Sequence, residues 1–297
     1  MYSRVVCRLA LPIGGGAFYA SVSAPRCETP RAAAPSTEPS PWSVTPALFR
    51  ALVHEAAGTG LIVALGCGSI ASSKFLGSAL GLGGIAAVWG GAVATAIYAT
   101  RDVSGAHLNP AVTVALAVHR PEVVSPYTAT YYMGAQLLGA TCAGIANALV
   151  FGRAIRAFEM KEGIVRGSLA SANTLGGAFC VAHNASALRG VPGIIGVEAL
   201  ATGLLTYVVF ALTDEQKSTP ASGAPVMIGV TVASLVAVFG PVSGAGLNPA
   251  RDLGPRIAAF AGGWGAAASR GLLPFTLGPI FGAVVGGAVY DRITNSK

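Results

Sequence analysis

Charged residues are scarce in this sequence: Asp, Glu, Lys and Arg make up 10% of 297 residues, against about 25% in ordinary soluble domains. So little charge argues against a soluble globular protein. Aromatic residues reach only 7% while hydrophobic residues reach 53%, so the apolar content is mostly aliphatic and alanine. The 40 glycines fall within apolar runs, which is typical of closely packed membrane helices. The composition therefore indicates a polytopic α-helical membrane protein and excludes disorder and collagen.

Clusters of basic residues and of cysteines are also lacking. The formal net charge is +7, but no run of Lys and Arg accompanies aromatic residues that could stack on bases, which argues against nucleic acid as a partner. No Gly-x-Ser-x-Gly, His-Glu-x-x-His or Cys/His constellation occurs, so we expect no enzyme activity, no metal and no cofactor. The five cysteines show no pair at metal-ligand spacing; they are Cys7, Cys27, Cys67, Cys142 and Cys180.

The first 45 residues differ in composition from the rest of the chain. They hold four arginines, several serines and five prolines between Pro25 and Pro41, and no acidic residue precedes Glu28. This composition fits a disordered N-terminal extension in the cytoplasm. It also fits an organelle transit peptide, which is rich in Arg and Ser and poor in acidic residues. A secretory signal is disfavoured because Pro12 and three glycines interrupt the apolar stretch near residues 9–20.

Six apolar segments are long enough to cross a bilayer core of about 30 Å as helices, which takes about 20 residues. We place them at residues 46–70, 82–100, 127–151, 192–212, 223–241 and 271–291. Two apolar stretches, 110–119 and 249–262, are too short to cross, and each begins at a proline preceded by asparagine. We expect these two to be re-entrant half-helices. Residues 46–291 then form one membrane domain, and residues 292–297 form a C-terminal tail.

The orientation follows from loop charge, because Lys and Arg are enriched on the cytoplasmic side. The N-terminal arginines and Arg50 favour an N-terminus inside, whereas five basic residues in the connection 152–190 oppose it. Asn184 begins an Asn-Ala-Ser tripeptide, a glycosylation acceptor that would have to face outward. We predict an N-terminus inside, in a multi-pass protein of the plasma membrane or an organelle membrane.

The chain contains an internal repeat, which bears on architecture. Residues 104–111 read Ser-Gly-Ala-His-Leu-Asn-Pro-Ala and recur at 243–250 as Ser-Gly-Ala-Gly-Leu-Asn-Pro-Ala. Glu55 recurs as Glu198 at nearly the same offset. Repeat one covers about 46–151 and repeat two about 192–291. Because each half holds three spans, the second half enters the membrane from the opposite side, so the repeat is inverted.

The two half-helices should meet near the centre of the membrane. Asparagine is a favoured N-cap and proline suits a first helical turn, so Asn109 and Asn248 cap helices whose positive dipole ends face each other and repel cations. Irregular backbone at membrane depth must be buried in protein or line a water-filled cavity. The segments 104–108 and 243–247, here called the lead-ins, therefore border a pore whose carbonyls and amides can bond an uncharged, hydroxylated solute.

Two motifs are paired in the repeat: Asn109-Pro110-Ala111 and Asn248-Pro249-Ala250-Arg251. They resemble the motifs of the major intrinsic protein family, the aquaporins and aquaglyceroporins, and the resemblance covers about residues 46–291. It implies an all-α membrane fold of six transmembrane helices plus two re-entrant half-helices, with one pore per subunit. It also implies a homotetramer embedded in membrane lipids, with water and small uncharged solutes as its other partners.

Four positions form the outer constriction in this family, and their spacing from the motifs carries them to Trp89, Val236, Ala245 and Arg251. Water-selective members usually place histidine at the second position, where this chain has Val236. Valine and alanine imply a wider, apolar wall beside the tryptophan and opposite the guanidinium, which suits a polyol. The quartet looks like that of plant nodulin-like intrinsic proteins.

A second sequence pattern bears on which solute the channel carries. Asp252 and Arg256 resemble the glycerol-facilitator pattern of an aspartate followed by a basic residue, whereas Phe275 and Thr276 depart from it. The resemblance implies a passive channel for water and small neutral solutes, glycerol or similar polyols, that excludes ions and protons. A water-selective aquaporin is the alternative.

Two carboxylates lie inside predicted spans, Glu55 and Glu198, and such groups raise the alternative of a proton-coupled solute carrier. Their repeat symmetry favours buried acceptors that hold the lead-ins by hydrogen bonds. We expect Asp252 to stabilise the first turn of the second half-helix, where an acid meets the positive dipole end. His107, and His54 beside Glu55, are expected to be structural or gating residues.

Overall fold

The computed structural model describes residues 43–181, 188, 190–214 and 222–294, together with two short strands nearer the N-terminus. The chain divides into two units, residues 1–43 and 44–297. In the first, strands β1 (Leu9–Ala10) and β2 (Tyr19–Ala20) pair antiparallel. Most of the predicted N-terminal extension, the Asn184 tripeptide and the last three residues of the predicted tail lie outside the described residues.

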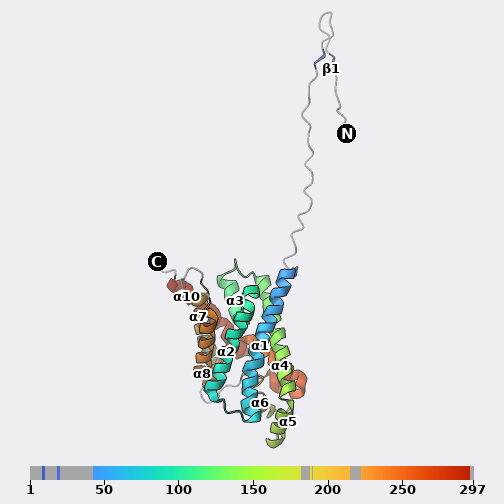
Figure 1. The fold of residues 1–297 in the computed structure, drawn as a ribbon, viewed down its shortest axis with the longest axis vertical. Coiled ribbons are helices and arrows are strands. Elements are labelled where there is room, and N and C mark those ends of the chain that lie inside the picture. Colours follow the sequence, from blue (N-terminus) through green and yellow to red (C-terminus); the bar gives the residue numbers. More distant parts are fainter. Residues whose placement is uncertain are drawn as a thin grey trace, which may run out of the picture. The chain divides into compact units, whose positions relative to one another are not determined.

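The second unit is a bundle of helices (Figure 1). Six of them are long and apolar enough to cross a membrane, and each overlaps one predicted span, so the prediction of six spans is confirmed. They are α1 (Pro46–Leu76), α2 (Gly81–Ser104), α4 (Pro126–Val150), α7 (Gly190–Thr213), α8 (Ala224–Ser243) and α10 (Leu272–Thr294). Helix α1 continues past its predicted end at residue 70, as far as Leu76.

Two short helices follow the lead-ins. Helix α3 (Pro110–His119) has the predicted bounds. Helix α9 (Pro249–Ala259) is shorter than the predicted 249–262, because the chain continues as a π-helical segment, η1 (Phe260–Trp264), and a 3-10 helix, η2 (Gly265–Ser269). The connection 152–190 holds two further helices that the sequence does not predict, α5 (Gly152–Lys161) and α6 (Ser171–Leu175).

Local sequence explains several helix ends. Thr45 and Ser125 cap α1 and α4, accepting from the backbone N–H three residues on at 3.2 and 3.1 Å, and a proline follows each cap in the first turn. Helices α2 and α8 end at Gly105 and Gly244, whose φ values of 80° and 90° lie in the left-handed region. Glycine adopts that conformation without a steric penalty, so the chain can turn there into each lead-in.

The two halves of the chain pack their long helices through equivalent contacts. A Cβ atom at Gly139 of α4 would overlap the carbonyl oxygen of Ala56 in α1, and a Cβ at Gly282 of α10 would overlap that of Ala199 in α7. The two residues of each contact are separated by the same interval along the chain, so the contacts occupy corresponding positions in the two repeats. Glycine lets the backbones touch, and each half therefore uses the same contact between its first and third spans.

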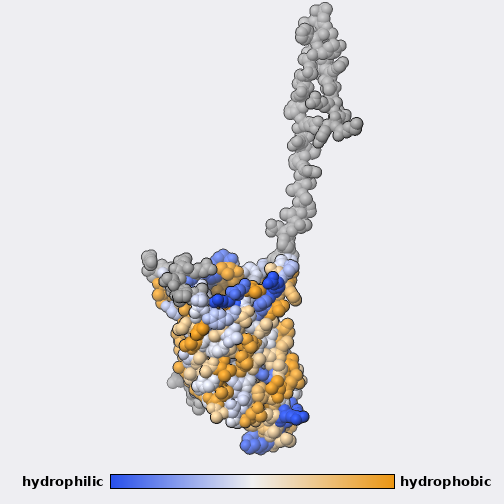
Figure 2. All heavy atoms as spheres, in the orientation of Figure 1, coloured by the Kyte–Doolittle hydropathy of each residue, from blue (hydrophilic) through white to orange (hydrophobic). Residues whose placement is uncertain are grey.

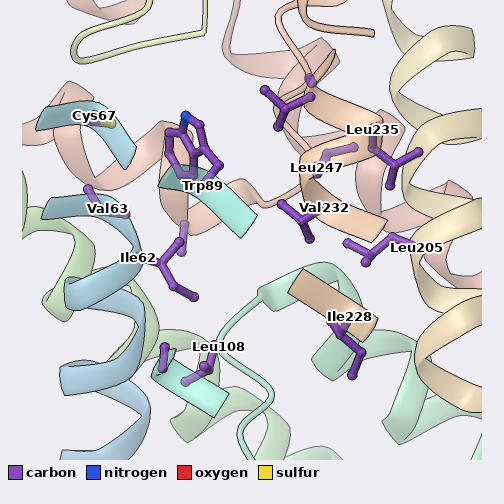
Figure 3. Close-up of a cluster of buried hydrophobic side chains, with 14 of the residues drawn as sticks. Ile62, Val63, Cys67, Trp89, Leu108, Leu205, Ile228, Val232, Leu235 and Leu247 are labelled. Atoms are coloured by element: carbon purple, nitrogen blue, oxygen red, sulfur yellow. The ribbon is translucent and has the colours of Figure 1, made fainter. Parts of the chain in front are cut away.

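The buried side chains of the core come from both halves. In Figure 3, Ile62 of α1 and Trp89 of α2 lie on one side, while Leu205 of α7 and Val232 of α8 lie on the other. The outer face is also apolar: Figure 2 shows hydrophobic side chains along the flank of the bundle and hydrophilic ones gathered at its ends. Six apolar spans with such a flank make this a multi-pass integral membrane protein.

The contact at Gly139 leads to a stability prediction. Gly139→Ala should lower the free energy of unfolding by about 1–3 kcal/mol, the usual cost of overpacking, because its methyl would force α1 and α4 apart. Gly134→Ala is the matched control, since a Cβ at Gly134 of the same helix meets no other atom within 4 Å. Thermal unfolding in detergent measures both; equal midpoints for the two variants would contradict the prediction.

Candidate functional site

A cavity of about 570 Å³ lies between the two halves of the bundle. Its walls follow successive turns of α2, α7 and α8, so it is elongated along the helices. Both lead-ins and both capping asparagines line it. Trp89, Val236 and Arg251 line one end, and Arg120 and Asp214 line the other.

The N-termini of α3 and α9 meet at the cavity. The Asn109 side chain donates from Nδ2 to the carbonyl oxygen of Leu247 at 2.9 Å, and Asn248 donates to that of Leu108 at 2.8 Å. Each amide oxygen caps its own helix by accepting from the backbone N–H two residues on, at 2.9 and 3.0 Å. A carboxamide carries two N–H donors, so each asparagine keeps a second donor for a molecule in the cavity.

Each lead-in is held by one buried glutamate. Glu55 accepts from the Ser104 hydroxyl at 2.7 Å and from the backbone N–H groups of His107 and Leu108 at 3.0 and 2.7 Å. Glu198 accepts from the equivalent three donors of the second repeat, at 2.6, 3.0 and 2.9 Å. Neither glutamate is exposed, and neither lines the cavity. Every one of these partners is a donor, which suits a carboxylate that only accepts.

The glutamates also orient the lead-in carbonyls. The N–H and C=O of one planar peptide unit point in opposite directions, so the carbonyls paired with the bound N–H groups point away from the glutamates. These carbonyls belong to residues 106, 107, 245 and 246, all of which line the cavity. The backbone is strained to do this: Ala106, Leu108, Ala245 and Leu247 have φ values of 53°, 52°, 47° and 57°, where non-glycine residues are uncommon.

The four predicted constriction residues, Trp89, Val236, Ala245 and Arg251, all line the same cavity and are at most 8% exposed. The Arg251 Cζ lies 4.6 Å from the centroid of the Trp89 ring. The ring packs on Gly66, where any Cβ would overlap it. In the part of the chain that the structure describes, Arg251 Nη1 has no hydrogen-bond partner and the guanidinium forms no ion pair with a carboxylate. This buried donor is therefore available to a solute.

Asp252 lies in the first turn of α9, as predicted, and its contacts extend beyond that helix. One carboxylate oxygen pairs with Arg256 Nε at 2.7 Å, and the other accepts from the backbone N–H of Val181 at 2.7 Å. Arg256 in turn donates to the carbonyl oxygen of Ala268 at 2.9 Å. Neither charged side chain lines the cavity. The pair instead ties the loop before α7 and the chain after α9 to the half-helix that carries Arg251.

The remaining candidate residues divide between the cavity and the packing around it. His107 lines the cavity, and its ring centroid lies 4.9 Å from that of Tyr132. His54 lies outside the lining and its Nδ1 bonds the Arg50 carbonyl at 2.8 Å. Phe275 is 1% exposed and packs in a small cluster with Val181 and Ile194. It therefore belongs to the core beside the second lead-in.

The sequence does not predict the charged group at the other end of the cavity. Arg120 forms a two-pronged ion pair with Asp291, with N···O distances of 3.1 and 2.6 Å. Nearby, Tyr290 donates from its hydroxyl to Asp214 at 2.5 Å. Arg120 and Asp291 lie far apart in the sequence, and no motif links them. The sequence feature that could have indicated a role for Arg120 is its position directly after the short apolar stretch 110–119.

Sequence comparison adds to this geometry. A family model described as major intrinsic protein matches residues 43–290. The chain belongs to the major intrinsic protein family. Known relatives include the glycerol uptake facilitator protein of Escherichia coli K12, which is 39% identical over 261 residues, covering 83% of this chain and 87% of that protein. The glycerol uptake facilitator protein of Pseudomonas aeruginosa is 36% identical, covering 82% and 86%.

Two further known proteins are similar to this chain. The propanediol uptake facilitator of Citrobacter freundii is 37% identical over 249 residues, covering 80% of this chain and 89% of that protein. The X-ray structure of the aquaglyceroporin from Plasmodium falciparum superposes with a TM-score of 0.70 at 24% identity, covering 84% of this chain and 98% of that one. This likeness shows the same fold, with six transmembrane helices and two half-helices.

The role of the glutamates can be tested at Glu198. In Glu198→Gln, an amide N–H₂ replaces an acceptor, so one buried N–H of the second lead-in loses its partner, at a cost of about 1–3 kcal/mol. We expect a lower unfolding temperature and a lower solute permeability. Glu162→Gln is the control, because Glu162 is exposed and lies outside the cavity lining. If Glu198→Gln unfolds at the wild-type temperature, the glutamate does not hold the lead-in.

Proposed function

We propose that the protein is a passive channel for water and small uncharged solutes, glycerol or similar polyols, that excludes ions and protons. One observation carries the proposal: the elongated cavity has a polar wall of lead-in carbonyls and asparagine amides, and an apolar wall that includes Val93, Leu205 and Val232. A polyol has hydroxyls along an alkyl backbone. It can therefore bond one wall and slide along the other, exchanging hydrogen bonds with water at small net cost.

The relatives support this choice of solute. Proteins named glycerol uptake facilitator and propanediol uptake facilitator match four fifths or more of the chain at 36–39% identity. Both named solutes are uncharged and carry hydroxyls on a three-carbon chain. We propose the same class for this protein, in subunits that assemble as a homotetramer in the membrane with the N-terminus inside.

We propose that Trp89, Val236, Ala245 and Arg251 act as the selectivity filter, and that the two Asn-Pro-Ala motifs form the central pore motif. The support is their position in the lining of one cavity. Arg251 offers hydrogen-bond donors, while Trp89 and Val236 offer an apolar surface for carbon atoms. This pairing favours a polyol over an ion, because neither apolar surface can replace the hydration of a charge.

Cations and protons should be excluded by the field at the centre. The N-termini of α3 and α9 meet where each capping asparagine bonds a carbonyl of the opposite lead-in, and each helix end carries roughly half a positive charge. Arg251, in the first turn of α9, extends this positive region toward the Trp89 end of the cavity. A cation would therefore lose its hydration at the point where the protein is most positive.

A proton-coupled carrier is the less favoured alternative. Such a carrier needs a carboxylate that exchanges protons with the transport path, but Glu55 and Glu198 lie outside the cavity lining. Each is also committed as an acceptor to the lead-in it holds. Proton binding would remove an acceptor that the lead-in needs, so these residues serve structure better than coupling.

The proposed function is tested with the purified full-length protein in proteoliposomes. Light scattering should show faster swelling in glycerol and faster water flow than in empty vesicles, at rates independent of an imposed pH gradient or voltage. Water flow without glycerol flow would favour the water-selective alternative. Acceleration by a proton gradient would overturn the channel in favour of the carrier.

Position 236 leads to a selectivity prediction. Val236→His should narrow the cavity beside Arg251 and add a polar group. Glycerol permeability should therefore fall about tenfold and water permeability less than about twofold, which corresponds to a difference of about 1 kcal/mol or more between the two changes in barrier height. Val238→His is a matched control, because Val238 is 63% exposed and lies outside the cavity lining. An equal loss of both permeabilities would mean that Val236 only supports the fold.

A further inference from the structure

The cavity has a second charged end, here called the Arg120 mouth, which is separate from the Trp89–Arg251 end. Arg120 follows α3, and its Cζ lies 5.0 Å from the centroid of the Phe210 ring on α7. Both side chains line the cavity. The other lining residues of the Arg120 mouth are Glu122, Val123, Thr213 and Asp214.

The Arg120 guanidinium is fixed from outside the cavity. Asp291 of α10 accepts from Nη1 at 3.1 Å and from Nη2 at 2.6 Å, and the His119 carbonyl accepts from Nη1 at 2.8 Å. A guanidinium has five N–H donors, and these three bonds use three of them in the described part of the chain. The single N–H of Nε and one N–H of Nη2 remain to bind a solute. The pKa of Arg120 is raised, chiefly by the hydrogen bond to Asp291, and the charges of Glu122 and Asp214 act in the same direction.

The Phe210 ring is also held in place. Its centroid lies 5.9 Å from that of His119 and 6.1 Å from that of Tyr290, both edge to face. The Phe210 and His119 rings pack on Gly287 of α10, where a Cβ would lie 3.0 Å from Phe210 and closer still to His119. The aromatic surface of the Arg120 mouth is therefore preformed, which lowers the entropy lost when a solute binds.

The two ends of the cavity thus carry the same pair of groups, an arginine and an aromatic ring. Each places an arginine beside an aromatic ring, at 4.6 Å in one case and 5.0 Å in the other. The ends differ in charge, because Arg251 forms no ion pair among the described residues while Arg120 is paired with Asp291. The Arg120 mouth therefore offers both N–H donors and carboxylate acceptors to a solute without a net positive barrier.

We propose that the Arg120 mouth is a second polyol-binding station, in which Arg120 donates to solute hydroxyls, Glu122 and Asp214 accept from them, and the carbon chain lies against Phe210. The inference rests on the proposed function, since only a channel that passes polyols would use such a station. It adds Arg120 and Phe210 to the residues that determine specificity, at the end of the cavity opposite the proposed filter.

A matched pair of substitutions tests the station. Arg166 resembles Arg120 in its ion pair, which is 2.6 Å long in both, and in side-chain exposure, 32% against 33%. It also stacks on an aromatic ring, that of Trp264 at 4.0 Å, but it does not line the cavity. Arg120→Gln and Arg166→Gln therefore differ mainly in whether the arginine can touch a passing solute.

Proteoliposome light scattering at low solute concentration gives the readout, for glycerol, 1,2-propanediol and water. For Arg120→Gln we expect glycerol permeability to fall about fivefold and that of propanediol, which has one hydroxyl fewer, about twofold, because charge-assisted hydrogen bonds are lost. Water permeability should stay within about twofold, since water bonds many partners equally well. Arg166→Gln should leave the glycerol-to-water ratio at the wild-type value.

Arg120→Lys keeps the charge next to Asp291 but loses the fork of donors, so it should lower the glycerol-to-water ratio even if Arg120→Gln fails to fold. A wild-type ratio in either folded Arg120 variant, or an equal fall in glycerol and water, would overturn the station and leave the channel intact. If the wild-type protein passes no glycerol, the proposed function itself fails, and the station with it.

Discussion

The structure depends on one constraint: backbone polar groups at membrane depth need hydrogen-bond partners, yet a pore for a hydroxylated solute needs some of them unpaired. Glu55 and Glu198 resolve this by binding the N–H side of each lead-in from behind. The carbonyl side is then turned into the cavity. This arrangement requires strained left-handed backbone conformations at Ala106, Leu108, Ala245 and Leu247. It also requires two carboxylates inside apolar helices.

Electrostatics varies along the cavity in a way that suits uncharged solutes. The centre is positive because two helix N-termini meet there, and the end beside Trp89 is positive because it carries Arg251. At the Arg120 mouth the positive charge is offset, because the carboxylates of Asp291, Glu122 and Asp214 act on one guanidinium. An ion of either sign therefore meets an unfavourable region, whereas an uncharged polyol meets hydrogen-bonding groups and apolar surface throughout.

Much of this fold could be predicted from sequence because its signals are local or repeated. Apolar length predicts the six spans, the Asn-Pro pairs predict the starts of α3 and α9, and the recurrence of residues 104–111 at 243–250 predicts the inverted halves. Helices α5 and α6 carry no such signal, and the ion pair of Arg120 with Asp291 joins residues that only the folded bundle brings together. Val236 and Ala245 are ordinary apolar residues in isolation, so their place in the cavity could be inferred only by spacing from a recognised motif.

The hydrogen bonds from each asparagine to the opposite lead-in have a consequence for a chain made of one repeat alone. Each asparagine caps its own helix, but its free amide group satisfies a carbonyl that belongs to the opposite repeat. One repeat alone would therefore leave that carbonyl and that amide without hydrogen-bond partners near the centre of the membrane. A chain made of one repeat would complete these hydrogen bonds only as two copies inserted in opposite directions, so each half of the present chain depends on the other for the integrity of its own lead-in.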